Sequence, residues 1–65
     1  MSKYLFIKNG IIDNILICNE TFANMWKDKQ RYDLTFSSIS NINIGQLYHD
    51  NKFWKVVDGR EVEIV

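Results

Sequence analysis

A small set of side chains in this sequence belongs to types that can act as nucleophiles, bases or metal ligands: Cys18, His49, Asp50, Asp58, Glu61 and Glu63. Cys18 directly precedes a segment with helical character, and the amides at a helix N-terminus lower a thiol pKa and make the thiol nucleophilic. A nucleophilic cysteine also needs a base. The only histidine, His49, falls at the tip of a predicted hairpin and has no reason to approach Cys18. We therefore predict a structural thiol at the end of a strand, because free cysteine is among the most buried residue types.

The other polar residues of this set have a structural interpretation as well. His49, Asp50 and Asp58 could bind a metal or share a proton, but these types also suit turns, where Asp bonds to local backbone amides. Glu61 and Glu63 alternate along a predicted strand beside Lys and Arg, which is typical of a solvated face rather than of a catalytic pair. The three glycines are isolated, so the sequence has no phosphate-binding loop. We predict no catalytic residue, no metal ligand and no cofactor, and therefore no enzyme.

The first element that must position these groups is a hairpin over residues 3–17. Asn9-Gly10 is a strong hairpin signal, because both residues tolerate the positive φ angles of a type I′ turn. A two-residue loop predicts three cross-strand pairs: Ile7 with Ile12, Leu5 with Asn14, and Tyr4 with Ile15. Both faces are then apolar, with Tyr4, Phe6, Ile11, Ile15 and Ile17 on one and Leu5, Ile7, Ile12 and Leu16 on the other. Such strands are covered on both sides, and a loop longer by one residue would reassign the pairs.

A helix from Glu20 to about Lys29 is predicted to cover one face of this hairpin. Asn19 can cap it, because an Asn side-chain oxygen accepts from the first free amides of a helix. Phe22, Met25 and Trp26 fall at i, i+3 and i+4 and so share one stripe. The segment is shorter than the ~12 to 15 residues that an isolated helix needs. We therefore expect the stripe to dock on the sheet.

The second half of the chain has the pattern of strands. Residues 31–36 alternate, with Tyr32, Leu34 and Phe36 on one side, and residues 37–41 have the composition of a loop. A meander turned by Asp50-Asn51 and Asp58-Gly59 follows. Its register predicts the pairs Tyr48 with Phe53, Leu47 with Trp54, Phe53 with Ile64, and Trp54 with Glu63. The predicted fold class is α+β and β-rich: an N-terminal β-hairpin, one short α-helix, then a strand and a C-terminal three-stranded antiparallel meander, in a small sheet or partial barrel.

The two faces of this meander differ in character. The predicted core face carries Ile44, Tyr48, Phe53, Val57, Val62 and Ile64. On the other face we predict a protein interface, with Trp54, Leu47 and Val56 as its apolar patch and Glu61 and Glu63 as its polar rim. The sequence has four Phe, three Tyr and two Trp, whereas an interior of this size holds about five or six rings. The alternative for Trp54 is plain core packing.

Length and charge limit the classes of partner. A chain of 65 residues closes one core, so residues 1–65 form a single domain. Eight basic and eight acidic residues give zero net charge, without the cluster of cations that a nucleic-acid backbone needs. One cysteine forms no internal disulfide, and Lys8-Asn9-Gly10 interrupts the first apolar run before an export signal forms. Residues 11–18, the longest apolar stretch, are far fewer than the ~20 that span a bilayer. We expect synthesis in the cytoplasm, no membrane, nucleic acid or small-molecule substrate, and a protein partner or a homo-oligomer.

Two stretches of the chain resemble a family of phage proteins. They are K-Y-L-F-I-K-N-G-I-I-D-N-I at residues 3–15 and I-G-Q-L-Y-H-D-N-K-F at residues 44–53. They resemble short tailed-bacteriophage proteins with an N-terminal K-Y-A-I-I-K-x-G-x-V-x-N-I strand pair and a C-terminal I-G-x-x-Y-D-G-x-x-F hairpin. His49-Asp50-Asn51 stands where that pattern has Asp-Gly, which leaves the turn type open. The resemblance implies a small non-enzymatic phage protein, a virion or tail-associated component, and no catalytic residue.

The function that we expect is therefore a structural or adaptor module that acts through protein–protein contacts and becomes part of a virion. The alternative is a small phage-encoded inhibitor that binds a host enzyme or a defence protein. Net neutrality excludes the strongly acidic mimics of nucleic acid from that alternative. What remains is surface plugging by residues 37–43 or by the tip His49–Lys52, because binding residues concentrate on loops.

Overall fold

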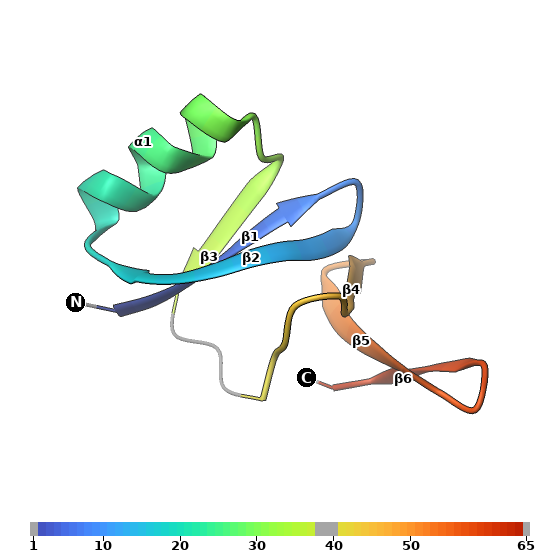
Figure 1. Cartoon of the computed structure of the whole chain (residues 1–65). Coiled ribbons are helices and arrows are strands. Elements are labelled where there is room, and N and C mark those ends of the chain that lie inside the picture. The colour runs from blue at the N-terminus through green and yellow to red at the C-terminus, as the bar shows by residue number, and fades with distance from the viewer. Residues whose placement is uncertain (1, 38–40, 65) are drawn as a thin grey trace.

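The computed structural model of this protein describes residues 2–37 and 41–64. Its elements are β1 (Ser2–Lys8), β2 (Ile11–Cys18), α1 (Glu20–Gln30), β3 (Leu34–Ser37), β4 (Leu47–His49), β5 (Lys52–Val57) and β6 (Arg60–Glu63). The strands form one open antiparallel sheet in the order β3-β1-β2-β4-β5-β6 (Figure 1). The predicted α+β, β-rich class with one short helix is confirmed. Residues 38–40 of the predicted loop lie outside the described residues, and Ser37 is the last residue of β3.

Each hairpin turns on two residues that both have positive φ angles: Asn9-Gly10 (54° and 75°), Asp50-Asn51 (54° and 61°) and Asp58-Gly59 (52° and 76°). This combination is the type I′ turn, whose twist matches that of the flanking strands. The three turns were predicted at these positions. The predicted meander register is also confirmed, with Leu47 opposite Trp54, Tyr48 opposite Phe53, and Trp54 opposite Glu63.

The first hairpin departs from its predicted register at one residue. Ile7 pairs with Ile12 as predicted, but the pairs beyond them are Phe6 with Asn14, Leu5 with Ile15, and Tyr4 with Leu16. Asp13 is the extra residue and forms a β-bulge. Because a slip of one residue moves every later side chain to the opposite face, Ile15 lies on the face of Leu5 and Leu16 on the face of Tyr4. Ile17 pairs with Lys3 and also lies on the face of Leu5, so the predicted faces of Ile15, Leu16 and Ile17 were wrong.

Hydrogen bonds tie the start of β3 to the first hairpin and its bulge. The Tyr32 hydroxyl donates to the Asp13 carboxylate at 3.0 Å. The Asp33 carboxylate accepts from the Asn9 amide at 2.8 Å, and the Asp33 amide donates to the Ile7 carbonyl at 2.8 Å. Partial burial and, after it, the bond to Asp13 raise the pKa of Tyr32 above its ordinary value. These contacts fix where the chain enters β3.

The sheet curls around an inner apolar cluster. Its buried members are Leu5, Ile7, Ile12, Ile42 and Phe53, and Ile15, Phe36, Tyr48 and Ile64 pack against them. The Phe36 ring on β3 lies 5.1 Å from the Tyr48 ring on β4, centroid to centroid. In a flat sheet, three strand spacings would separate β3 from β4 by about 14 Å. The contact between these rings therefore requires the sheet to bend until β3 and β4 approach each other.

The helix begins and ends at residues with capping geometry. The Asn19 side chain accepts from the Phe22 amide at 2.8 Å, as the predicted cap requires. Arg31 has a φ of 59° and its amide bonds back to the last turn, which is a left-handed C-cap. The strand predicted over residues 31–36 therefore begins only at Leu34, because the cap occupies its first positions.

The helix docks on the outside of the curled sheet through Ala23 and Trp26, so only Trp26 of the predicted stripe packs against the sheet. Ala23 is the buried residue of α1 and joins Phe6 and Cys18 in a second cluster, with Trp26 half-buried against it. Phe22 and Met25 remain 39% and 47% exposed. The helix lies close to β1 at this contact. The Ala23 methyl group fits between them, and larger side chains lie on either side of it. Phe22 instead stacks on Trp26, with ring centroids 5.8 Å apart.

The turn end of the β5–β6 hairpin projects away from β1, β2 and β3 (Figure 1). Phe53 and Ile64 of the predicted core face reach the cluster. Val57, Val62 and Ile44, predicted on the same face, are exposed. The molecule measures 37 × 21 × 17 Å along its principal axes. Because Val57 and Val62 are exposed near the turn of this hairpin, the alternating sequence pattern alone overestimates the burial of the strand pair.

Candidate functional site

The residues predicted to form an interface lie on one face of the sheet. Residues directly opposite each other on antiparallel strands share a face. The relevant pairs are Leu47 with Trp54, Trp54 with Glu63, and Val56 with Glu61. The inner cluster takes Tyr48 and Phe53 from the other face. We call the face that carries Leu47, Trp54, Val56, Glu61 and Glu63 the outer face of β4–β6.

The outer face of β4–β6 is partly apolar and accessible. Helix α1 lies over β1 and β3, at the other end of the sheet (Figure 1), so no described helix covers this face. Val56 is 61% exposed, while Leu47 and Trp54 are half-buried. Ile11, which pairs with Leu47, is 45% exposed and extends the apolar surface onto β2.

Contacts with one residue hold the Trp54 side chain in place. Its indole stacks on the imidazole of His49, with centroids 4.7 Å apart and planes 6° from parallel. Its Nε1–H donates to the backbone carbonyl of His49 at 3.0 Å. Stacking and hydrogen bonding together select one orientation of the indole. His49 therefore restrains the orientation of the Trp54 indole.

His49 also lies between two carboxylates. Its Nδ1 is 3.1 Å from an Asp50 oxygen, and its Nε2 contacts Glu61 on β6. The hydrogen bond to Glu61 first, and then the one to Asp50, raises the pKa of His49 above its ordinary value. Both carboxylates favour the imidazolium, because an opposite charge and an accepting oxygen stabilise the protonated form. The side chain thus links β4 to β6 across the outer face of β4–β6.

Each of the two glutamates on this face contacts a basic side chain. The Lys52 ammonium lies 2.9 Å from a Glu63 oxygen, and Glu61 contacts His49. Among the contacts of these glutamates with described residues, none is to a nucleophilic side chain. Within residues 2–37 and 41–64, no group of three or more His, Cys, Asp or Glu side chains could hold a metal ion. The arrangement supports binding by a partly apolar face, with charged groups around it.

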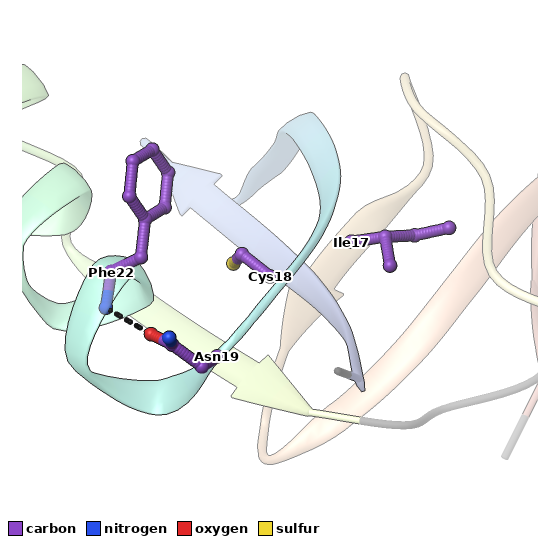
Figure 2. A pocket seen from close by; sticks show the side chains of 4 residues that line it. All are labelled: Ile17, Cys18, Asn19 and Phe22. Carbon is purple, nitrogen blue, oxygen red and sulfur yellow. Dashed lines mark hydrogen bonds between the residues drawn. The ribbon is translucent and has the colours of Figure 1, made fainter.

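Cys18 belongs to a different part of the fold. It lines a pocket of about 270 Å³ together with Ile17, Asn19 and Phe22, at the junction of β2 and α1 (Figure 2). The predicted position of Cys18, buried at the end of a strand, is confirmed, because Cys18 ends β2 and packs against Ala23 of α1. The Asn19 oxygen already accepts from the Phe22 amide, as Figure 2 shows. The remaining lining is apolar and mostly exposed, so this pocket presents little polar chemistry to a ligand.

The contribution of His49 to the outer face of β4–β6 was missed by the sequence analysis. His49 was interpreted there as a turn residue, and its contacts with Trp54 and Glu61 were not predicted. The signal was present in the register, because His49 pairs with Lys52 and so places Trp54 diagonally across the ladder. Diagonal neighbours are within reach of aromatic side chains.

No protein-family model matches this sequence, and neither a curated protein nor a solved structure is significantly similar to it. Among the residues that the structure describes, no helix has the length and apolar character needed to cross a membrane.

Proposed function

We propose that this chain is a non-enzymatic structural or adaptor module that docks through the outer face of β4–β6 on another protein subunit. The observation that carries this proposal is a sheet face that no described helix covers and that presents a tryptophan oriented by two contacts with His49. Tryptophan is strongly enriched among the residues that dominate binding energy at interfaces. Val56 and Ile11 add exposed apolar surface beside it.

The fixed indole favours binding for an energetic reason. Burial of apolar surface contributes about 25 cal/mol per Å² before the costs of association are subtracted. Part of that cost is the ordering of side chains at the interface. The contacts of Trp54 with His49 order its side chain before a partner arrives. Glu61 and Glu63 would lie at the edge of the contact, where charged groups remain hydrated.

We further propose that the assembly is a tailed-phage virion. The resemblance of residues 3–15 and 44–53 to short tailed-phage proteins supports this proposal. Mass spectrometry of virions purified from the native source should detect the chain. Absence from the virion, with a gene among early anti-host genes, would favour the host-directed inhibitor instead.

Analytical ultracentrifugation tests whether the partner subunit is a second copy. If it is, the wild-type chain should sediment as an oligomer and the Trp54→Ala variant as a monomer. A well-folded monomer in both samples would reject the form of the proposal in which the chain binds itself.

The matched control uses two exposed valines on opposite faces of the same strand pair. Val56 lies on the outer face of β4–β6, whereas Val62 pairs with Lys55 on the other face. Val56→Lys should abolish oligomer formation, or capture of the partner from virion extracts, because it places a charge inside the contact. Val62→Lys should leave oligomer formation unchanged, and it should reduce capture of the partner less than Val56→Lys does. Equal loss in the two variants would contradict docking through this face.

A further inference from the structure

The strand β6 is an edge of the sheet, with β5 as its one neighbour among the described strands. The Ile64 amide donates to the Phe53 carbonyl on β5 at 2.8 Å. In a strand, the amide and the carbonyl of one residue point to the same side, and those of the next residue point to the opposite side. The amides and carbonyls of Glu61 and Glu63 therefore point away from β5, toward the free edge. All residues of β6 are exposed.

Two copies of this edge would repel each other. In an antiparallel pair related by a two-fold axis, residues with outward peptide groups lie opposite each other. Such a register places Glu61 or Glu63 of one copy opposite Glu61 or Glu63 of the other. Like charges directly opposite each other destabilise a strand pair. Acidic side chains at this edge thus disfavour a continuous sheet between copies, as charged edge strands do in general.

We propose that the β6 edge accepts an extended segment of a partner protein with Lys or Arg at two alternate positions and an apolar residue between them. Paired antiparallel, the two cations lie opposite Glu61 and Glu63, on the outer face of β4–β6. The apolar residue lies opposite Val62, which is exposed on the other face. Backbone hydrogen bonds to the outward peptide groups supply affinity, and the alternate cations supply specificity.

The glutamates remain able to bind these cations although each already contacts one side chain. Glu61 uses one oxygen for His49, and Glu63 uses one for Lys52. A carboxylate has two oxygens and accepts several hydrogen bonds. The Glu61 and Glu63 side chains are also 48% and 44% exposed, so an incoming ammonium or guanidinium reaches them from solvent.

This inference rests on the proposed function, since it names the kind of segment that a docked protein would present. The test uses the full chain and three blocked hexapeptides as probes: T-K-V-K-V-T, its acidic counterpart T-E-V-E-V-T, and the basic peptide N-methylated at its two lysines. Amide chemical shifts of the ¹⁵N-labelled chain report where each peptide binds. The basic peptide should shift the amides of Glu61 and Glu63 and bind about tenfold more tightly than the acidic one. N-methylation should abolish binding, because it removes backbone donors.

Two variants separate edge pairing from general charge attraction. Glu61→Gln/Glu63→Gln should weaken binding of the basic peptide severalfold and remove its dependence on salt. Glu63→Pro should block the edge while keeping the β5–β6 hydrogen bonds, because the Glu63 amide points outward. If Glu63→Pro unfolds, binding of the N-methylated peptide to the wild-type chain still tests whether backbone hydrogen bonds at the β6 edge are required.

Three outcomes would overturn the edge proposal: equal binding of the acidic peptide, shifts confined to other strands, or concentration-dependent shifts of the Glu61 and Glu63 amides without peptide. The last outcome would mean that copies pair through β6. Val56→Ser should weaken partner docking but leave peptide binding unchanged, because it removes apolar surface from the outer face of β4–β6 and adds no charge opposite Glu61. Weaker partner docking in Val56→Ser without any peptide binding would reject the edge and keep the proposed function.

Discussion

The imidazole of His49 lies face to face on the indole of Trp54, with ring centroids 4.7 Å apart and planes 6° from parallel. The two residues belong to antiparallel strands joined by a type I′ turn, which brings their side chains to one face. His49 also contacts Glu61 on β6. The His49 side chain therefore contacts the turn, the tryptophan and the edge strand, so its protonation should affect all three.

The stability of the chain should fall as pH rises through the pKa of His49. In the folded state this pKa is raised by Glu61 and then by Asp50, whereas an unperturbed histidine titrates near about 6.5. A raised pKa stabilises the fold fully below the unfolded value, and this contribution disappears above the folded value. The urea midpoint should be higher at about pH 6 than above the folded pKa. Both conditions keep the carboxylates ionised, since Asp and Glu titrate near about 4.

Three variants check this origin of the pH dependence. His49→Gln should remove the slope of stability against pH in this window. In NMR titrations, Glu61→Gln should lower the pKa of His49 more than Asp50→Asn does, because the bond to Glu61 is the larger cause. An unchanged slope in His49→Gln, or the reverse order of the two carboxylate variants, would contradict the arrangement.

Replacement of Trp54 should separate its two contacts with His49. Trp54→Phe keeps a ring for stacking but loses the donor to the His49 carbonyl, so the free energy of unfolding should fall by about 1 kcal/mol. Trp54→Ala loses the stack as well, and should cost about 0.5–1.5 kcal/mol more for that term alone. Denaturant unfolding measures both losses. If the two variants were equally stable, the stack would contribute nothing.

Deletion of Asp13 should be tolerated although it lies inside a strand. The bulge accommodates one extra residue, so its removal leaves Phe6 opposite Asn14 and Leu5 opposite Ile15. The bond from the Tyr32 hydroxyl disappears, at a cost of about 1 kcal/mol. Deletion of Ile15 is the matched control, because it places Asn14 opposite Leu5 in the inner cluster. That control should unfold or lose several-fold more stability in urea, and equal losses would argue against the bulge.

Substitutions in α1 should be costly at the alanine and not at the methionine. Ala23 is 1% exposed against Phe6 and Cys18, so Ala23→Leu should overpack the contact and cost about 1–3 kcal/mol. Met25 is 47% exposed, and Met25→Gln should change stability by less than about 0.5 kcal/mol. Thermal unfolding of the two variants tests the docked face. If Met25→Gln cost more stability than Ala23→Leu, the helix would dock through Met25, as the spacing of apolar residues predicts.

Much of the fold was predictable because its signals are local. Type I′ turns need residues that tolerate positive φ angles, and Asn9-Gly10, Asp50-Asn51 and Asp58-Gly59 are such pairs. Asn19 caps α1 through a bond to an amide three residues on. A two-residue turn fixes the register of the strands beside it, and the face of Trp54, Leu47 and Val56 follows from that register.

The sequence by itself thus determined the turns, the helix cap and the composition of the outer face of β4–β6, because each depends on residues adjacent in the chain or directly across a tight turn. Only the tertiary structure decided the bulge at Asp13, the choice of Ala23 as the docking residue, and the contact of His49 with Glu61. These three features depend on how far the sheet curls and how closely the helix approaches it. Packing between distant segments sets those distances, and periodicity in a single sequence carries no measure of them.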